Sequence, residues 1–153
     1  MEEFLLDIVE IEESKLQESA APYDSSRDFV TLEAWKRCRE VRLFIYQQIL
    51  KRLPPEEKYD LGSQMRRAAI SIILNIAEGH GRYHFKEGIQ YYRISRGSLY
   101  ELKDGLIICL DNEYIDRQLF DQGISLIEMA KSTLNGYIKF VQKQRANTSK
   151  SKT

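Results

Sequence analysis

The amino-acid sequence predicts an all-α protein, an antiparallel four-helix bundle with up-down-up-down order. Apolar residues recur at intervals of three and four through most of residues 31–141, the periodicity of helices that bury one face. Three prolines and eight glycines are too few for the many turns of an all-β fold. The breaks between the periodic segments are short, which favours antiparallel neighbours. With 153 residues, 42% of them hydrophobic, the chain has material for one domain with a buried core.

Three segments are expected along the chain. Residues 1–30 form an acidic N-terminal extension and linker, residues 31–141 the four-helix bundle, and residues 142–153 a basic flexible tail. Within residues 1–18 apolar side chains stand at roughly helical intervals, and two alternatives stay open for them, a short amphipathic helix or a disordered segment. Residues 19–28 have the small and polar composition of a linker.

The first predicted helix has Thr31 as its N-cap and ends before Pro54 and Pro55, which cannot continue a helix. It carries two apolar stripes, a wider face than one neighbouring helix needs, and this predicts contact with a second subunit. The first stripe comprises Ala34, Cys38, Val41, Ile45 and Ile49, and the second comprises Leu43, Tyr46, Leu50 and Leu53.

The second predicted helix begins after Asp60 as N-cap and ends at Gly79, a residue suited to a helix C-terminus. Its apolar residues lie on nearly all sides, which predicts a central helix surrounded by others. The main stripe comprises Leu61, Met65, Ala68, Ile72 and Ile76, and further apolar residues are Ala69, Ile70, Ile73, Leu74 and Ala77.

The third predicted helix covers residues 85–110, and the fourth begins after Asp116 as N-cap. Small residues in the third helix, Ser95, Gly97 and Ser98, are expected to let another helix approach closely. Core positions of the third helix are Phe85, Ile89, Tyr92, Leu99, Leu102 and Leu106. Those of the fourth helix are Phe120, Ile124, Ile127, Ala130, Leu134, Ile138 and Val141.

Charge is unevenly distributed along a chain whose formal net charge is zero. Residues 1–30 hold nine acidic and two basic side chains, whereas residues 31–103 hold fourteen basic and eight acidic ones. The segment 104–140 has a net charge of −3 and the segment 141–153 a net charge of +4. Both a nucleic-acid-binding surface and ordinary solvated helix faces are compatible with this distribution.

Cationic side chains crowd the first three helices, and tyrosines are interleaved with the later ones. Arginine and lysine bind phosphates and tyrosine stacks on bases, so the pattern predicts a basic face that binds RNA or DNA. The candidate residues are Arg37, Arg39, Arg42, Arg66, Lys86 and Arg93, with Arg67, Arg82 and Arg96 as weaker candidates. The alternative is structural: tyrosines in the core or an interface, and arginines paired with glutamates.

Motifs of catalytic chemistry are missing from the sequence, and no catalytic residue, metal or cofactor is expected. His80 and His84 have a metal-binding spacing, but the glycines beside His80 do not favour a regular helix through both. The only cysteines, Cys38 and Cys109, stand at apolar positions and are expected to be buried and inert. A cytoplasmic location without membrane association is expected, because no long apolar run is present and the first residues are acidic.

Two long motifs resemble a known family. The stretch QMRRAAISIILNIAEG at residues 64–79, followed by Arg82, and the stretch RGSLYEL at residues 96–102 resemble four-helix-bundle proteins encoded in 23S rRNA intervening sequences. That family is related to the accessory variability determinants of diversity-generating retroelements. The resemblance covers about residues 31–141. It implies a ring-like homopentamer, and in the retroelement branch a basic surface that binds nucleic acid and a partnership with a reverse transcriptase.

The shared motif also implies a polar lock inside the bundle, since polar groups on a buried helix must find partners. Its residues here are Asn75, Glu78, Arg82, Ser98 and Glu101, accompanied by Gly79 and Gly97. Two functions stay open. The first is a noncatalytic RNA-binding accessory of a reverse transcriptase. The alternative is an intervening-sequence protein that acts as an oligomeric protein-binding scaffold without binding nucleic acid.

Overall fold

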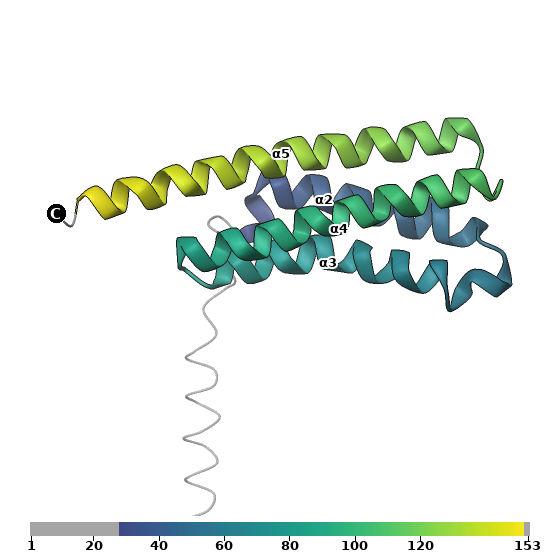
Figure 1. Cartoon of the computed structure of the whole chain (residues 1–153), viewed down its shortest axis with the longest axis horizontal. Helices are drawn as coiled ribbons and strands as arrows, with labels where there is room; N and C mark the ends of the chain where they lie inside the picture. The colour runs from purple at the N-terminus through teal and green to yellow at the C-terminus, as the bar shows by residue number, and fades with distance from the viewer. Residues whose placement is uncertain (1–27, 152–153) are drawn as a thin grey trace, which may run out of the picture.

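The computed structural model describes residues 28–151, which fold into four long helices and contain no strand (Figure 1). The long helices are α2 (Glu33–Phe44), α3 (Leu61–Gly81), α4 (Phe85–Asp111) and α5 (Arg117–Lys150). Shorter helical segments are η2 (Phe29–Thr31), η3 (Ile45–Ile49), η4 (Leu50–Arg52) and η5 (Pro55–Lys58). The all-α prediction is confirmed for these residues. Most of the predicted acidic extension and linker falls in residues 1–27, outside the described part.

The first long helix begins differently from the prediction. Leu32, not Thr31, precedes α2, and it makes no side-chain capping bond. Thr31 instead belongs to the preceding turn η2, where its hydroxyl donates to the carbonyl oxygen of Asp28 at 2.7 Å. Beyond Phe44 the same helical path continues through the π-helical segment η3 and the 3₁₀ segment η4. It ends at Leu53, which is extended ahead of Pro54, as the sequence predicts.

Both ends of α3 and α4 and the start of α5 agree with the sequence to within two residues. Asp116 caps α5, since its carboxylate accepts the backbone N–H of Leu119 at 2.8 Å. Asp60 precedes α3, but its side chain makes no capping bond. The Glu57 carboxylate accepts the backbone N–H of Leu61 instead, at 3.2 Å. The cap of α3 is therefore supplied from η5 rather than from the adjacent residue.

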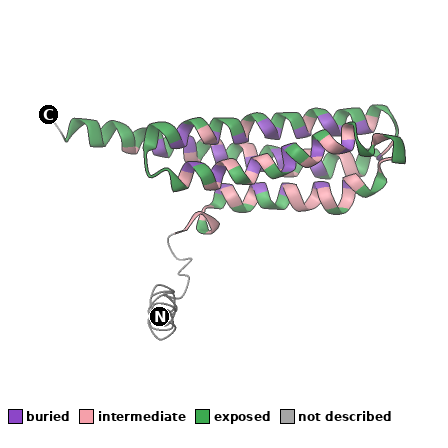
Figure 2. Ribbon diagram, turned by 90° about the horizontal axis from the view of Figure 1, so that it is seen from below, coloured by how far each residue is buried: buried purple, intermediate pink, exposed green. Residues whose placement is uncertain are grey.

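The core lies between the four helices, whose inward sides carry the buried residues (Figure 2). Four helix pairs are in contact: α2 with α3, α3 with α4, α4 with α5, and α5 with α2. Because α2 and α4 share the same two neighbours, they lie diagonally across the bundle. The largest fully buried side chains are Cys38, Val41, Ile45, Ile49, Met65, Ile72, Ile76, Leu99, Leu102, Leu106, Ile127 and Leu134.

Small residues bring α3 and α4 close together. The buried Ser95 hydroxyl donates to the carbonyl oxygen of Ile72 at 2.5 Å. A Cβ on Gly79 would lie 2.6 Å from the Tyr92 ring, and a Cβ on Gly105 would lie 3.1 Å from the Met65 side chain. Gly97, in contrast, is exposed, and a Cβ there would meet nothing within 4 Å. The predicted close approach is confirmed at Ser95 but is wrong at Gly97.

The composition of α3 predicts a helix surrounded by others. In the single chain, however, one side of α3 is open. Ile70 is 40% exposed and Leu74 is 59% exposed on its outer side. The reason is geometric: α3 contacts only α2 and α4 extensively, and the other side has no neighbour among residues 28–151. Phe85, predicted to face the core, is also 42% exposed, because it stands at the very start of α4.

Helix α5 continues to Lys150, through most of the segment predicted to be a flexible tail. No glycine or proline interrupts residues 142–150, so the backbone hydrogen bonding of α5 continues. Its last turns are exposed and extend past the ends of the other helices (Figures 1 and 2). None of the helices in residues 28–151 combines the length and the apolar character required to cross a membrane.

Candidate nucleic-acid interface

The structure does not bring the six predicted cations together. Arg37, Arg39 and Arg42 lie on α2, Arg66 lies on α3, and Lys86 and Arg93 lie on α4. Because α2 and α4 are diagonal in the bundle, their outer sides face in different directions. In the single chain these six cations therefore do not form one continuous face, and their predicted role in nucleic-acid binding stays a prediction.

Several of these arginines are engaged by groups of the same chain. Arg37 pairs with Glu33 at 3.5 Å and with Glu40 at 3.2 Å. The half-buried Arg42 guanidinium lies over the Tyr46 ring, 5.8 Å from its centre. Arg66 donates to the carbonyl oxygen of Lys58. Arg39 is exposed, but it is isolated from the cations of α4.

A denser group of cations lies between the first half of α4 and the last third of α5. Two hollows follow one another along this helix pair, one lined by Arg93, Arg96 and Lys139, the other by Lys86 and Arg145. No carboxylate is among the described residues that line them. We refer to these five residues as the basic groove. It gathers positive charge from both helices.

The cations of the basic groove differ in how they are held. Arg96 is half-buried and donates to the Asn135 side-chain oxygen at 3.0 Å, a bond between α4 and α5 that holds its guanidinium in place. The other four are exposed. Lys86 and Arg93 are seven residues apart, roughly 10 Å along the helix. Such a row can contact successive backbone phosphates of one nucleic-acid strand.

The sequence predicts Lys86 and Arg93 but not the α5 side of the groove. Lys139 falls in a segment of net negative charge, and Arg145 falls in the segment predicted to be a flexible tail. One signal in the sequence points to them: no Asp or Glu follows Glu128, while six basic residues do. Lys139 and Arg145 form one surface with the cations of α4 only because α5 packs against α4, and this contact joins residues far apart in the sequence.

The predicted polar lock separates into two groups. In the first, the hydroxyls of Ser71 and Ser98 are 2.8 Å apart, and the Asn75 amide donates to the Ser71 hydroxyl and carbonyl oxygens, both at 2.9 Å. In the second, Arg82 pairs with Glu78 at 2.6 Å. The pairing with Glu78 raises the pKa of Arg82.

Three members of the predicted lock lie on the outside of the chain. Glu78 and Arg82 have side chains that are 48% and 45% exposed, and Glu101 is exposed as well. The prediction of an internal lock is therefore wrong for these three. The physical reason is that α3, which carries Glu78, and α4, which carries Glu101, each have a side open to solvent, so polar residues there need no buried partner. Only Ser98 is buried, and Asn75 is half-buried.

These motif residues border an exposed apolar strip. Ile70, Leu74 and Tyr91 line one hollow together with Asn75 and the Glu78–Arg82 pair. Arg82 also donates to the Tyr91 hydroxyl at 2.9 Å. Ile94, 51% exposed, stands three residues from Tyr91 on the same side of α4. We call Ile70, Leu74, Tyr91 and Ile94 the outer α3–α4 face.

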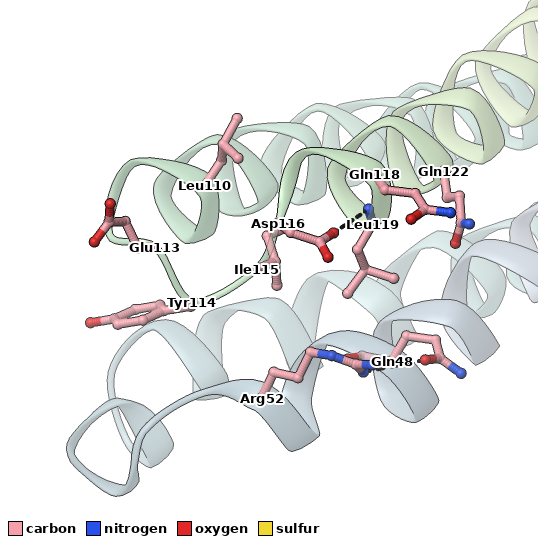
Figure 3. Close-up of a pocket in the computed structure, with 10 residues that line it drawn as sticks. All are labelled: Gln48, Arg52, Leu110, Glu113, Tyr114, Ile115, Asp116, Gln118, Leu119 and Gln122. Atoms are coloured by element: carbon pink, nitrogen blue, oxygen red, sulfur yellow. Dashed lines mark hydrogen bonds between the residues drawn. The ribbon is translucent and has the colours of Figure 1, made fainter.

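A polar hollow lies at the other end of the bundle, beside the turn between α4 and α5 (Figure 3). Its charged groups serve local structure: Asp116 caps α5, and Arg52 donates to the Gln48 carbonyl oxygen at 2.5 Å. Glu113 lines it as well, in the turn itself. Two carboxylates in this hollow make it a poor site for phosphate.

Groups suited to nucleophilic or metal chemistry are not assembled in residues 28–151. Cys38 and Cys109 are fully buried, as predicted, and burial raises their pKa to about 12 and about 11. Such thiols stay protonated near neutral pH and are not nucleophiles. His80 is half-buried and His84 is exposed. No set of three or more metal-ligating side chains occurs within the described range.

Comparisons with known proteins agree with the helical architecture. A family model described as 23S rRNA-intervening sequence protein matches residues 30–136. A crystal structure of a protein with unknown function from the S23 ribosomal protein family of Bacteroides thetaiotaomicron is similar, with a TM-score of 0.63. The two sequences are 20% identical, and the similarity covers 69% of this chain and 98% of that chain. At this identity the likeness shows the fold alone. No curated protein matches the chain.

Proposed function

The chain belongs to the family of 23S rRNA-intervening sequence proteins, and on this premise we propose that it is a noncatalytic RNA-binding accessory protein. The observation that carries the proposal is the basic groove, where five cations from α4 and α5 line two successive hollows free of carboxylates. Backbone phosphates are the ligand that such a row of exposed cations suits best.

Assembly is part of the proposal, since it would multiply this charge. The outer α3–α4 face exposes apolar side chains that a second copy of the chain could cover, beside the polar groups of the family motif. The resemblance to the retroelement branch implies five copies of an up-down-up-down bundle in a ring. Each copy would then add its basic groove to one extended positive field.

The proposed protein partner is a reverse transcriptase, as the same resemblance implies. The acidic segment of residues 1–30 is suited by charge to a basic partner or to competition with phosphate for the groove. The alternative is an oligomeric scaffold that binds protein only. The exposed apolar face serves both alternatives, so the basic groove is the feature that discriminates between them.

Charge reversal in the groove tests RNA binding. Replacing Arg93→Glu and Lys139→Glu together should weaken RNA binding and reduce the slope of log Kd against log salt concentration by about two units, one for each lost phosphate contact. Fluorescence anisotropy with labelled RNA over a series of salt concentrations measures both effects.

The matched control is Arg39→Glu with Lys51→Glu, two exposed residues along the α2–η4 path that change the net charge equally. This control should retain most of the affinity, because α2 is diagonal to α4. If the groove variant binds RNA like the intact protein at every salt concentration, the groove is only a solvated surface and the scaffold function is favoured.

A further inference from the structure

Tyr83, the residue that follows the C-cap of α3, ends this helix in the left-handed conformation common at that position, and it does so as an exposed aromatic residue. Its backbone φ is 51°, in the left-handed region that disfavours residues with a Cβ. Glycine is the residue best suited to this conformation, but the nearest glycine, Gly81, stands two residues earlier, and Tyr83 occupies the position itself. The Tyr83 side chain is 92% exposed, so packing does not account for a large aromatic residue there.

The surroundings of Tyr83 combine aromatic and cationic groups. Tyr83, His84 and Phe85 line one hollow with Lys86 and Arg145. Phe85 is 42% exposed although it is apolar. This hollow is the open end of the basic groove, where the last turns of α5 lie beside the α3–α4 turn. Exposed rings with cations next to them are the two elements of a site for single-stranded nucleic acid.

We propose that the basic groove takes single-stranded RNA and that Tyr83 stacks on an unpaired base at its open end, an inference that rests on the proposed RNA binding. The bases of a duplex are already stacked on each other and cannot cover a protruding ring, whereas a single strand presents free base faces. Lys86 and Arg145 would then bind the phosphates that flank the stacked base, and Arg93, Arg96 and Lys139 those further along.

Binding of labelled single-stranded RNA of about 12 nucleotides, compared with the same sequence as a duplex, tests the inference on the full-length protein. Tyr83→Ala should weaken binding of the single strand about 5- to 100-fold and leave duplex binding unchanged. Tyr83→Phe and Tyr83→Trp should keep most of the affinity, because they keep an aromatic face. A fluorescent base analogue in the strand should be quenched by the intact protein and not by Tyr83→Ala.

Tyr59→Ala is the matched control. Tyr59 is 79% exposed and has Lys58 5.3 Å from its ring centre, but it stands at the opposite end of α3. This variant should bind the single strand like the intact protein. Circular dichroism should give the same melting temperature for Tyr83→Ala and the intact chain, since an exposed ring adds little to folding.

The outcomes separate the two proposals. If the intact protein binds neither RNA form, the proposed function fails. If it binds RNA in a way that depends on Arg93 and Lys139 but not on Tyr83, only the stacking inference is overturned. The exposed Tyr83 ring would then be assigned to a contact with another protein. Equal affinity for the single strand and the duplex would overturn it as well.

Discussion

At the scale of single residues, the space around a glycine decides whether replacing it with alanine raises or lowers the free energy of unfolding. A Cβ on Gly79 would lie 2.6 Å from the Tyr92 ring and 3.0 Å from the Gly88 carbonyl oxygen, so α3 and α4 would have to move apart. A Cβ on Gly136 would meet nothing within 4 Å on the exposed side of α5. The two positions form a matched pair for testing the close packing of α3 on α4.

Gly79→Ala should lower the free energy of unfolding by about 1–3 kcal/mol through overpacking. Gly136→Ala should raise it by about 0.5–1 kcal/mol, because alanine loses less conformational freedom than glycine in a helix. Urea denaturation followed by circular dichroism measures both changes. A Gly79→Ala protein as stable as the parent would mean that the two helices are less tightly packed than the structure indicates.

At the scale of elements, the last turns of α5 are separable from the bundle that supports them. Val141 is the last residue of α5 that is buried, and residues 145–150 are all exposed. Arg145 nevertheless contributes to the basic groove. The end of α5 is therefore expected to matter for RNA binding and to matter little for folding.

A chain ending at Gln142 should keep its free energy of unfolding to within about 0.5 kcal/mol, as is usual for changes at exposed sites. Its affinity for RNA should fall, because Arg145 of the basic groove is removed together with Lys143, Lys150 and Lys152. The full-length variant Lys143→Gln with Arg145→Gln is the control, and it should lose affinity to a similar degree. If truncation unfolds the protein in a thermal melt, residues 143–151 support the core in a way that their exposure does not indicate.

The helices themselves could be predicted because their signals are local. Pro54 ends the first helix wherever the rest of the chain lies, and Asp116 caps α5 through a backbone group three residues away. The prediction of Thr31 as the N-cap of the first helix also rests on a local signal, but it is wrong because the Thr31 hydroxyl donates to the carbonyl oxygen of Asp28 within a short turn. The buried stripes of α3, α4 and α5 also follow from spacing alone.

The candidate site could be predicted only in part because it depends on which helices are neighbours. Periodicity gives each helix a buried side but not the number of its neighbours, so the sequence does not show that Glu78 and Arg82, which the family motif places in a polar lock, lie on an open side of α3. The sequence predicts Lys86 and Arg93 as nucleic-acid-binding residues and the structure leaves both exposed, but Lys139 joins them only through the packing of α4 against α5.

At the scale of the whole molecule, we expect the outer α3–α4 face to decide whether the protein is a single bundle or an assembly. Leu74 is 59% exposed there, and the neighbouring Ile70 and Ile94 are 40% and 51% exposed. Exposing several apolar side chains of this size to water is unfavourable, and a second copy of the chain that covered them would remove this cost.

Leu74→Glu should convert the assembly to a monomer of 18.0 kDa in multi-angle light scattering, because a carboxylate would have to be buried in the interface. Phe140→Glu, at a residue 56% exposed on α5, is the control and should leave the assembly unchanged. An intact protein that is already monomeric at micromolar concentration would contradict the expectation.

The π-helical segment η3 has a consequence for how the first helix keeps its phase. Val41, Ile45 and Ile49 are four residues apart and all three are buried. In a regular α-helix each such step would turn the side chain by about 40°, so that Ile49 would lie about 80° around the axis from Val41. The wider turn at Ile45–Ile49, where the N–H of Leu50 bonds back to the carbonyl oxygen of Ile45, offsets this rotation. The first helix thus contains one more residue than a regular helix needs over the same core. At η3 its length can change by a single residue without exposing a buried side chain to solvent.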